Sequence, residues 1–328
     1  MHARWCNPIS GVLAAVLALA SSAGFAQNGT WPGQPVRFIV PYTPGGGTDT
    51  VTRHVADAIS AGTKWVFLVD NKPGANGNIG MDAVAKAKPD GYTIGMGQTS
   101  NLAINPVITP KMPFDAARDL VPVALVAELP MVMVVRTESP WKTLADAIRS
   151  AKSKPGESKQ ALAGNGTVGH LAGEMLSRRA GIQVLNIPYK GAAPAITDLI
   201  GGQTDYMFAS PQAVVGMIKG GKLRALAVTS EKRLSILPDV PTVAESGYPD
   251  FVAMDWKAVV APAGTPADVV RRLNAEVAKA LTQPALLATL EAEGSIPGSG
   301  NPEQAAAFIR SEQVKWAGLI REAGIKGE

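Results

Sequence analysis

Hydrophobic and polar positions alternate in blocks along the chain, and the blocks have the lengths of strands and helices. Runs rich in β-branched and aromatic residues, typical of buried strands, occupy residues 36–41, 65–70 and 92–97. Each run is followed by a loop and then by helical sequence, with the first helix starting at Thr48 or Asp49. This alternation predicts parallel strands joined by right-handed helical crossovers.

A second series of strands follows the apolar region at residues 121–135. Four of its predicted strands are each followed by helical sequence, at residues 131–135, 160–163, 184–187 and 206–209. Residues 223–229 and 251–261 are further candidates for buried strands. We therefore expect two α/β units.

The C-terminal part of the chain has helical periodicity. Thr265 is expected to cap a helix, with Pro266 at its first position and Asp268 completing a capping box. The apolar face of this helix is formed by Val269, Val270, Leu273, Val277 and Leu281. Asn301 and Pro302 predict the start of a last helix in the same way.

Length and composition narrow the protein class. The 328 residues suffice for two domains, and 46% hydrophobic with 18% charged residues is typical of a folded globular chain. A net charge of +4, with sparse aromatic residues that are not interleaved with basic clusters, disfavours a nucleic-acid partner.

The first 26 residues are predicted to be a secretory signal peptide. Arg4 supplies positive charge, residues 11–20 are an apolar run, and small residues precede a cleavage site near Ala26. A membrane anchor is the alternative, but a spanning helix needs about 20 apolar residues. Cys6 lies before the apolar run, so the mature chain would contain no cysteine and no disulfide.

Two glycine-rich loops are candidates for ligand binding, because ligands of open α/β sheets bind beyond the carboxyl ends of the strands. Residues 44–48 and 73–80 contain no Lys or Arg, so a carboxylate held there would be bound by amides and hydroxyls. The alternative is that the glycines only form tight turns. Asp49 could cap the following helix, which is the better expectation, or order water around a ligand.

A third loop, residues 164–169, matches G-x-G-x-x-G but lacks the acidic residue that a dinucleotide site needs about 20 positions later. We therefore expect no nucleotide cofactor. Apart from the leader, His54 and His170 are the only histidines, which leaves little material for a metal site or a catalytic triad. His170 could donate to a bound anion or be a surface or cap histidine.

Several short sequence segments, taken together and in their order along the chain, resemble the tripartite tricarboxylate transporter receptor family, also called Bug proteins. The resemblance covers nearly the whole mature chain. It is carried by residues 36–49 (VRFIVPYTPGGGTD), 71–80 (NKPGANGNIG), 88–93 (KPDGYT), 170–174 (HLAGE), 188–191 (PYKG), 201–205 (GGQTD), 237–242 (LPDVPT) and 261–266 (APAGTP).

The resemblance implies a periplasmic receptor of the type II binding-protein fold, without enzymatic activity. Residues 27–127 and 230–328 would form lobe 1, and residues 128–229 lobe 2. The receptor, expected to be monomeric, would close on a small carboxylate and deliver it to a two-component membrane permease. The ligand classes include dicarboxylates, tricarboxylates, acidic amino acids and aromatic acids.

The resemblance also assigns binding positions to both lobes. The first loops would hold one carboxylate, and the region after residue 97 would select the distal part of the ligand. The predicted binding residues are Tyr42, Gly46, Gly47, Thr48, Asp49, Ala75, Asn76, Gln98, Thr99 and Ser100 on lobe 1, and Thr167, His170, Tyr189, Asp205 and Phe208 on lobe 2.

Some alternatives stay open at the level of sequence. Residues 251–256 are also expected to select the distal part of the ligand. Trp256 and Phe208 could stack on an aromatic acid or pack in the core. A secreted hydrolase or isomerase on a similar scaffold would depend on His170 or Asp49. A ligand sensor that touches a signalling partner is a third reading.

Overall fold

The computed structural model describes residues 1–2, 31–189 and 191–325 and divides into two units, Met1–Gly33 and Gln34–Glu328. All that follows concerns the second unit. The signal peptide predicted over residues 1–26 lies almost entirely outside the described residues. Within the described part of the chain, no helix combines the length and the apolar character needed to cross a bilayer.

Lobe 1 is built on a six-stranded sheet with the strand order β11-β4-β10-β3-β1-β2. Its strands are β1 (Val36–Val40), β2 (Phe67–Asn71), β3 (Thr93–Gln98), β4 (Leu120–Pro130), β10 (Met254–Pro262) and β11 (Ile296–Pro297). Its helices are α2 (Gly47–Gly62), α3 (Asn78–Ala85), α4 (Asn105–Ile108), α9 (Ala267–Ala280), α10 (Pro284–Ala292) and α11 (Pro302–Ala323), with short turns η2 (Ala75–Gly77) and η3 (Ser100–Ile104).

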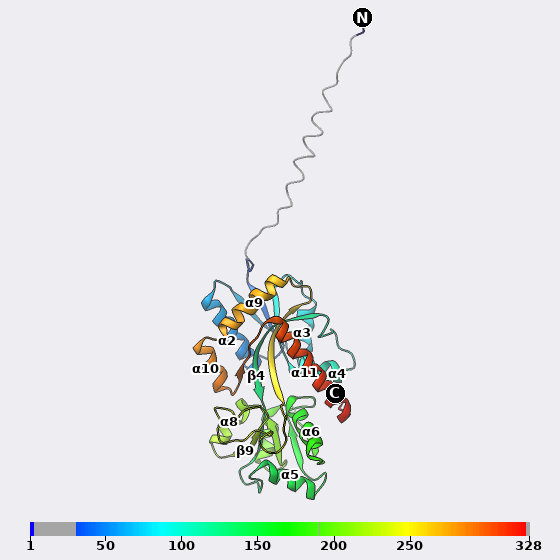
Figure 1. Cartoon of the computed structure of the whole chain (residues 1–328), viewed down its shortest axis with the longest axis vertical. Coiled ribbons are helices and arrows are strands. Elements are labelled where there is room, and N and C mark those ends of the chain that lie inside the picture. Colours follow the sequence, from blue (N-terminus) through cyan, green and yellow to red (C-terminus); the bar gives the residue numbers. More distant parts are fainter. Residues whose placement is uncertain (3–30, 190, 326–328) are drawn as a thin grey trace. The chain divides into compact units, whose positions relative to one another are not determined.

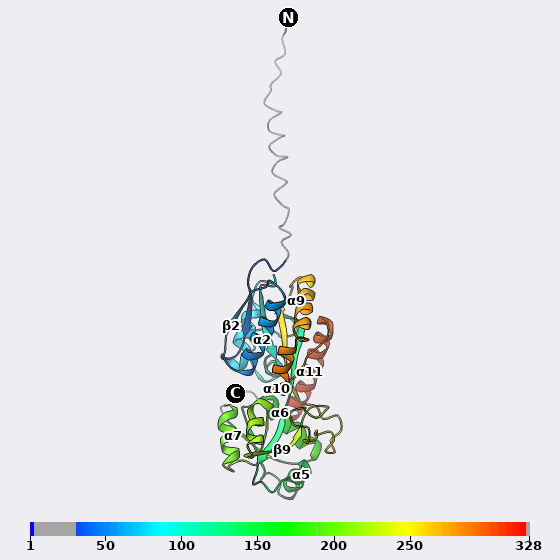
Figure 2. The ribbon, with the colours of Figure 1, turned by 90° about the vertical axis from the view of Figure 1, so that its left-hand side faces the viewer.

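Lobe 2 is built on a five-stranded sheet with the order β7-β6-β8-β5-β9. Its strands are β5 (Val132–Arg136), β6 (Lys159–Leu162), β7 (Leu185–Pro188), β8 (Tyr206–Ala209) and β9 (Leu223–Val228). Its helices are α5 (Leu144–Ser153), α6 (Val168–Ala180), α7 (Ala192–Ile200) and α8 (Pro211–Lys219). Figures 1 and 2 show each set of helices surrounding its own sheet.

The predicted parallel pairing holds for only part of each sheet. Strand β1 pairs in parallel with β2 and β3, and β6 with β7 and β8. Strand β10, however, is antiparallel to β3 and β4, and β5 is antiparallel to β8 and β9. Strand β5 enters the lobe 2 sheet directly from β4 of lobe 1, and β10 enters the lobe 1 sheet from β9 of lobe 2, so neither follows a local helical crossover.

The lobes are joined where β4 leads into β5 and where β9 leads towards β10. Thr229 connects the two crossings: its Oγ1 accepts from Met131 N–H at 2.7 Å and donates to Ala253 O at 2.5 Å. Its backbone N–H also donates to Met131 O, and its carbonyl accepts from Ala253 N–H. The two crossings therefore form one hydrogen-bonded joint. The lobe limits drawn from the sequence, 27–127 with 230–328 and 128–229, stay a prediction.

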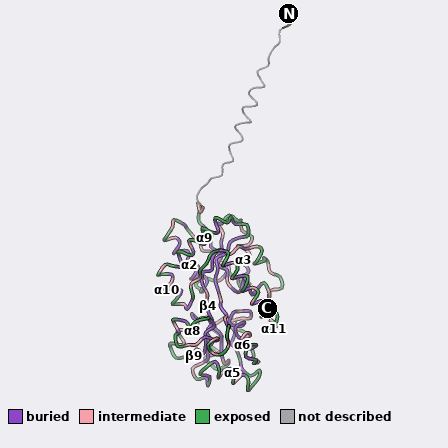
Figure 3. Tube along the Cα trace, in the orientation of Figure 1, coloured by how far each residue is buried: buried purple, intermediate pink, exposed green. Residues whose placement is uncertain are grey.

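Apolar residues from both lobes form the core, which Figure 3 shows as buried segments along the strands. Trp256 on β10 is fully buried, and its Nε1 donates to Glu312 on α11 at 3.0 Å. Trp316 donates to the same Glu312 oxygen at 2.9 Å. Of the two roles considered for Trp256, the structure thus shows packing in the core, where the indole is hydrogen-bonded to α11.

The predicted helix starts near the C-terminus differ in outcome. The capping box predicted for α9 is wrong, because the hydroxyl of Thr265 donates to Pro262 O and the helix starts without a side-chain cap. The apolar face of α9 is buried as predicted. At α11 the prediction is confirmed: Asn301 is the N-cap and forms a capping box with Gln304.

Candidate ligand-binding site

A cavity of about 200 Å³ lies between the two lobes. Lobe 1 contributes Asn76, Gln98, Ser100 and Asp255 to its wall. The rest of the wall belongs to lobe 2 and its joint: Met131, Ala163, Thr167, Val168, Gly169, Ala192, Met207, Phe208, Ala209 and Ser210.

Two further cavities adjoin this one between the lobes. One, of about 660 Å³, shares Asn76, Ala163 and Thr167 with the first and extends to Ala75 and Tyr189. The other, of about 400 Å³, shares Ser210 with the first. It brings the Gly45 and Gly47 turn of lobe 1 against the start of α8, where it is also lined by Gln212 and Glu293. Together the three cavities form the interlobe cleft.

Helix N-termini from both lobes border the cleft. The first turn of α6 and the starts of α7 and α8 line the central cavity, and the start of α2 lines the cavity at the glycine turn. Helices α2, α7 and α8 have no side-chain cap on their first N–H groups. Since such ends carry unpaired donors and a partial positive charge, they favour an anion. Among the described residues that line the three cavities, none is Lys or Arg.

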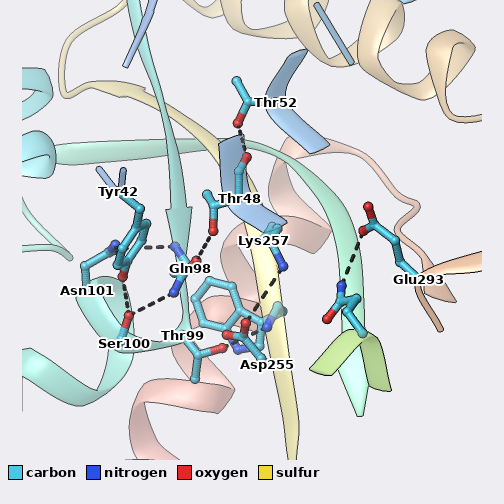
Figure 4. A network of polar contacts seen from close by, with 12 residues as sticks. Tyr42, Thr48, Thr52, Gln98, Thr99, Ser100, Asn101, Asp255, Lys257 and Glu293 are labelled. Atoms are coloured by element: carbon cyan, nitrogen blue, oxygen red, sulfur yellow. Dashed lines mark hydrogen bonds and ion pairs between the residues drawn. The ribbon is translucent and has the colours of Figure 1, made fainter. Parts of the chain in front are cut away.

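A hydrogen-bond network shapes the lobe 1 wall (Figure 4). Thr48 Oγ1 donates to Gln98 Oε1 at 2.6 Å, and Gln98 Nε2 donates to Ser100 Oγ at 3.2 Å. Tyr42 Oη lies 2.6 Å from Ser100 Oγ and donates to the carbonyl of Asn76 at 3.3 Å. Burial raises the pKa of the Tyr42 hydroxyl, which therefore keeps its proton. The network joins the segments that follow β1, β2 and β3.

The Asn76 turn is held in an unusual backbone conformation. Gly74, Ala75, Asn76 and Gly77 all have positive φ, with Ala75 at 47° and Asn76 at 51°. A left-handed alanine is strained, and such strain persists where surrounding contacts impose it. Asn105 supplies such contacts, because its Nδ2 donates to Asn76 O and its Oδ1 accepts from Asn76 Nδ2.

Asp49 holds the glycine turn in place through a hydrogen bond to its backbone. It lies in the first turn of α2 and accepts from the backbone N–H of Gly45 at 2.9 Å, and also from Arg53 and Asn71. Burial acts to raise the pKa of Asp49, but these hydrogen bonds outweigh it and lower the pKa to about 2. Asp49 is thus an ionised carboxylate that fixes the turn. It is not the N-cap residue, which is Gly46.

On lobe 2, Thr167 caps α6. Its hydroxyl donates to Gly164 O at 2.9 Å and accepts from His170 N–H at 3.3 Å. His170 is buried, and its Nδ1 accepts from the backbone N–H of Gly166 at 3.1 Å. Burial lowers the pKa of His170, while Glu174 opposes this shift. The imidazole is therefore a neutral support of the Gly164 to Gly169 loop, and not a surface residue.

The other predicted residues fall into two groups. Tyr189 lines the 660 Å³ cavity and donates to Asp198 at 2.8 Å, and Phe208 lines the central cavity. Asp205 lies at the opposite end of β8, where it accepts from Lys159 N–H, and the structure does not bring it to the cleft. Thr99 is fully buried and accepts from Trp256 N–H.

Four of the remaining residues support the wall without lining a cavity: Tyr42, Gly46, Thr48 and Asp49. Sequence reasoning also missed several residues of the cleft, above all Asp255 and Ser210. Asp255 lies in a stretch that had been assigned to ligand selection as a whole, without any residue singled out for its charge. The signal was the pair Asp255 and Lys257, two charges at alternate positions of an apolar strand, which place both on one face of the sheet.

Comparisons with known proteins agree with this architecture. The model of the tripartite tricarboxylate transporter family receptor matches residues 51–325. Protein BugT of Bordetella pertussis is 38% identical over 316 residues, which cover 96% of this chain and 97% of BugT. A solved R. palustris protein with adipate is 34% identical with a TM-score of 0.80, covering 90% of this chain and 99% of that one. The periplasmic binding protein BugD is 34% identical with a TM-score of 0.76, covering 91% and 100%.

Two α/β lobes around a cleft bordered by helix N-termini define the class of periplasmic solute-binding receptors. Within that class, this chain belongs to the tripartite tricarboxylate transporter receptor family.

Proposed function

We propose that this receptor captures a small carboxylate in the interlobe cleft and delivers it to a tripartite tricarboxylate-type membrane permease. The observation that carries the proposal is the convergence of four helix N-termini on a cleft whose described lining contains no Lys or Arg. Such a site meets negative charge with amides and hydroxyls. The adipate-bound relative, a complex with a dicarboxylate, supports this ligand class.

In this proposal each lobe supplies one half of the site. On lobe 1, Asn76, Gln98 and Ser100 face the ligand, while Tyr42, Thr48 and Asp49 hold these groups in place. On lobe 2, the ligand meets Thr167, the first turn of α6, Phe208 and Tyr189. The joint at Thr229 would let the lobes close on the ligand.

The proposed receptor binds its ligand without converting it. The hydrolase or isomerase alternative needs His170 or Asp49 at the reacting centre, but neither lines a cleft cavity. His170 Nδ1 is occupied by Gly166, and Asp49 is paired with Arg53 at 2.9 Å. We therefore assign both residues positioning roles.

Thermal unfolding of the purified protein against a panel of organic acids and their uncharged amides tests the proposal. With ligand at about 100 times its Kd, stabilisation of about 2.7 kcal/mol is expected for a cognate acid and none for its amide. The acid must also be recovered unchanged after incubation. A panel in which no carboxylate stabilises the protein would reject the ligand class.

Export and oligomeric state belong to the same proposal. We place signal cleavage near Ala26 and expect the mature protein to act as a monomer. N-terminal sequencing of the protein from a periplasmic extract tests the first point, and light scattering after gel filtration tests the second. An uncleaved N-terminus or a stable dimer would contradict the respective point.

A further inference from the structure

Among the described residues that line the cleft, the charged side chains are acidic. Of the described residues around the central cavity, only Asp255 carries a formal charge, and around the glycine-turn cavity only Glu293 does. The 660 Å³ cavity has no charged residue among its described lining. A ligand in the central cavity therefore faces helix N-termini from lobe 2 and a carboxylate from lobe 1.

Asp255 is placed there by the alternation of strand β10. Trp256 donates to Glu312 in the core, so Asp255 and Lys257 lie on the opposite face of the sheet. Figure 4 shows the side chains of Asp255 and Lys257 directed towards each other. The Asp255 side chain is 20% exposed, whereas that of Lys257 is 3% exposed. Lys257 lines none of the three cleft cavities. A ligand in the central cavity would therefore meet the Asp255 carboxylate and not the Lys257 side chain.

Lys257 leaves Asp255 free to accept further hydrogen bonds. Its Nζ lies 3.8 Å from Asp255 Oδ2, beyond the usual range of about 2.7 to 3.2 Å for a hydrogen bond to nitrogen. An ionised carboxylate offers about four acceptor positions on two oxygens. Burial lowers the pKa of Lys257, and the attraction of Asp255 and Glu293 opposes that shift. Lys257 is thus a buried neighbour of Asp255 that lines no cleft cavity, whereas Asp255 lines the central cavity.

We propose that Asp255 binds an ammonium group of the ligand, so that the receptor selects an amino acid over the carboxylic acid of the same skeleton that lacks the amine. The inference rests on the proposed function, since the ligand carboxylate would lie at the helix N-termini. A second carboxylate beside Asp255 would meet a like charge, whereas an ammonium would meet an opposite one. The cavity wall is complementary to a zwitterion.

Isothermal titration calorimetry with matched ligand pairs tests this inference. The pairs are aspartate and succinate, glutamate and glutarate, and alanine and propionate, which differ only in the α-ammonium. We expect the wild-type protein to bind the amino member of at least one pair about tenfold more tightly or better, which corresponds to about 1.4 kcal/mol. In Asp255→Asn, which keeps the size but removes the charge, this preference should fall to about threefold or less.

Asp205→Asn is the matched control, because Asp205 is a carboxylate of lobe 2 that accepts from Lys159 N–H outside the cleft. It should keep the wild-type preference, and circular dichroism checks that both variants fold. Equal or tighter wild-type binding of the deaminated acids, or an unchanged preference in Asp255→Asn, would overturn the inference and leave the proposed function standing. Failure of all six acids while another carboxylate of the organic-acid panel binds would also overturn the inference alone. Failure of the six acids and of the whole panel would overturn the proposed function itself.

Discussion

Thr48 Oγ1 donates a 2.6 Å hydrogen bond to Gln98 Oε1 and so joins the start of α2 to the end of β3. The two residues are 50 positions apart in sequence, and both segments border the cleft. The bond fixes which side of the Gln98 amide faces Ser100, whose hydroxyl accepts from Nε2. Thr48, whose side chain lines none of the three cavities, thereby determines the polar surface that Gln98 and Ser100 present to the cleft.

Replacing Thr48 with valine tests this coupling. Thr48→Val keeps the side-chain shape but leaves Gln98 Oε1 without its donor, so ligand affinity should fall about five- to tenfold, with a stability loss of about 1 kcal/mol. Calorimetric titration and denaturant unfolding measure the two effects.

Thr52→Val is the control for that experiment. Thr52 is buried on the same helix and donates only to Thr48 O within the helix. Its replacement should cost similar stability and leave affinity unchanged. Equal affinities for all three proteins would show that the bond to Gln98 does not shape the site.

A side chain at Gly169 should disturb the cavity wall. A Cβ at this position would overlap the backbone carbonyl of Phe208, so α6 must move away from β8. We expect Gly169→Ala to lower stability by about 1 to 3 kcal/mol and to weaken ligand binding. The control is Gly216→Ala in α8, where a Cβ meets no atom within 4 Å. That variant should gain up to about 1 kcal/mol, because alanine favours a helix. Equal stability of the two variants would contradict the assigned packing.

The buried His170 makes stability depend on pH. Its folded-state pKa lies below the unfolded value of about 6.5, so the unfolded chain takes up a proton first as the pH falls. The contribution is complete above about pH 7 and is lost as the pH drops below the unfolded pKa. His170→Gln keeps an acceptor for Gly166 but does not titrate. Wild type should therefore lose more stability than the variant between pH 7 and pH 5 in urea unfolding. Parallel stability curves would show that the imidazole does not titrate as described.

Glu312 holds two buried indoles, and its removal should destabilise lobe 1. In Glu312→Ala the N–H groups of Trp256 and Trp316 lose their acceptor, at a cost of about 1 to 3 kcal/mol each. Unfolding followed by tryptophan fluorescence measures the loss. Glu322→Ala, with its side chain 69% exposed on the same helix, should change stability by less than about 1 kcal/mol. Similar stability losses in both variants would contradict the claim that the two indole hydrogen bonds to Glu312 stabilise lobe 1.

Local sequence was enough to place most of the strands, because most of them are short apolar runs. It marked residues 120–130 only as part of an apolar region and not as the strand β4, and it gave no sign of the two-residue strand β11. It did not predict how β10 pairs, since that strand returns from the other lobe to lie between β3 and β4. The predicted cap at Thr265 was wrong for a similar reason. The hydroxyl of Thr265 donates to Pro262 O, and the residue preferences of helix caps do not take such a competing carbonyl into account.

The glycine loops were found because their composition limits what they can bind. Sequence could not decide whether Asp49 and His170 contact the ligand or support a loop, because the same polar residue types serve both roles. Their partners, the backbone N–H groups of Gly45 and Gly166, are brought to them only by the fold. Asp205 was transferred from a resemblance, and the direction of β8 places it at the end of the strand away from the cleft. Asp255 was missed because its carboxylate lines the cleft only if that face of β10 is directed towards lobe 2, and the sequence does not show which face is.

The central claim is that helix-end amides and hydroxyls, rather than a basic side chain, neutralise the ligand carboxylate. Its most direct test is a calorimetric comparison of the cognate acid with the amide made from that carboxylate, titrated into the wild-type protein. Binding of the acid at least about 100-fold more tightly is the predicted result, equivalent to about 2.7 kcal/mol. Equal affinity of acid and amide would contradict the claim.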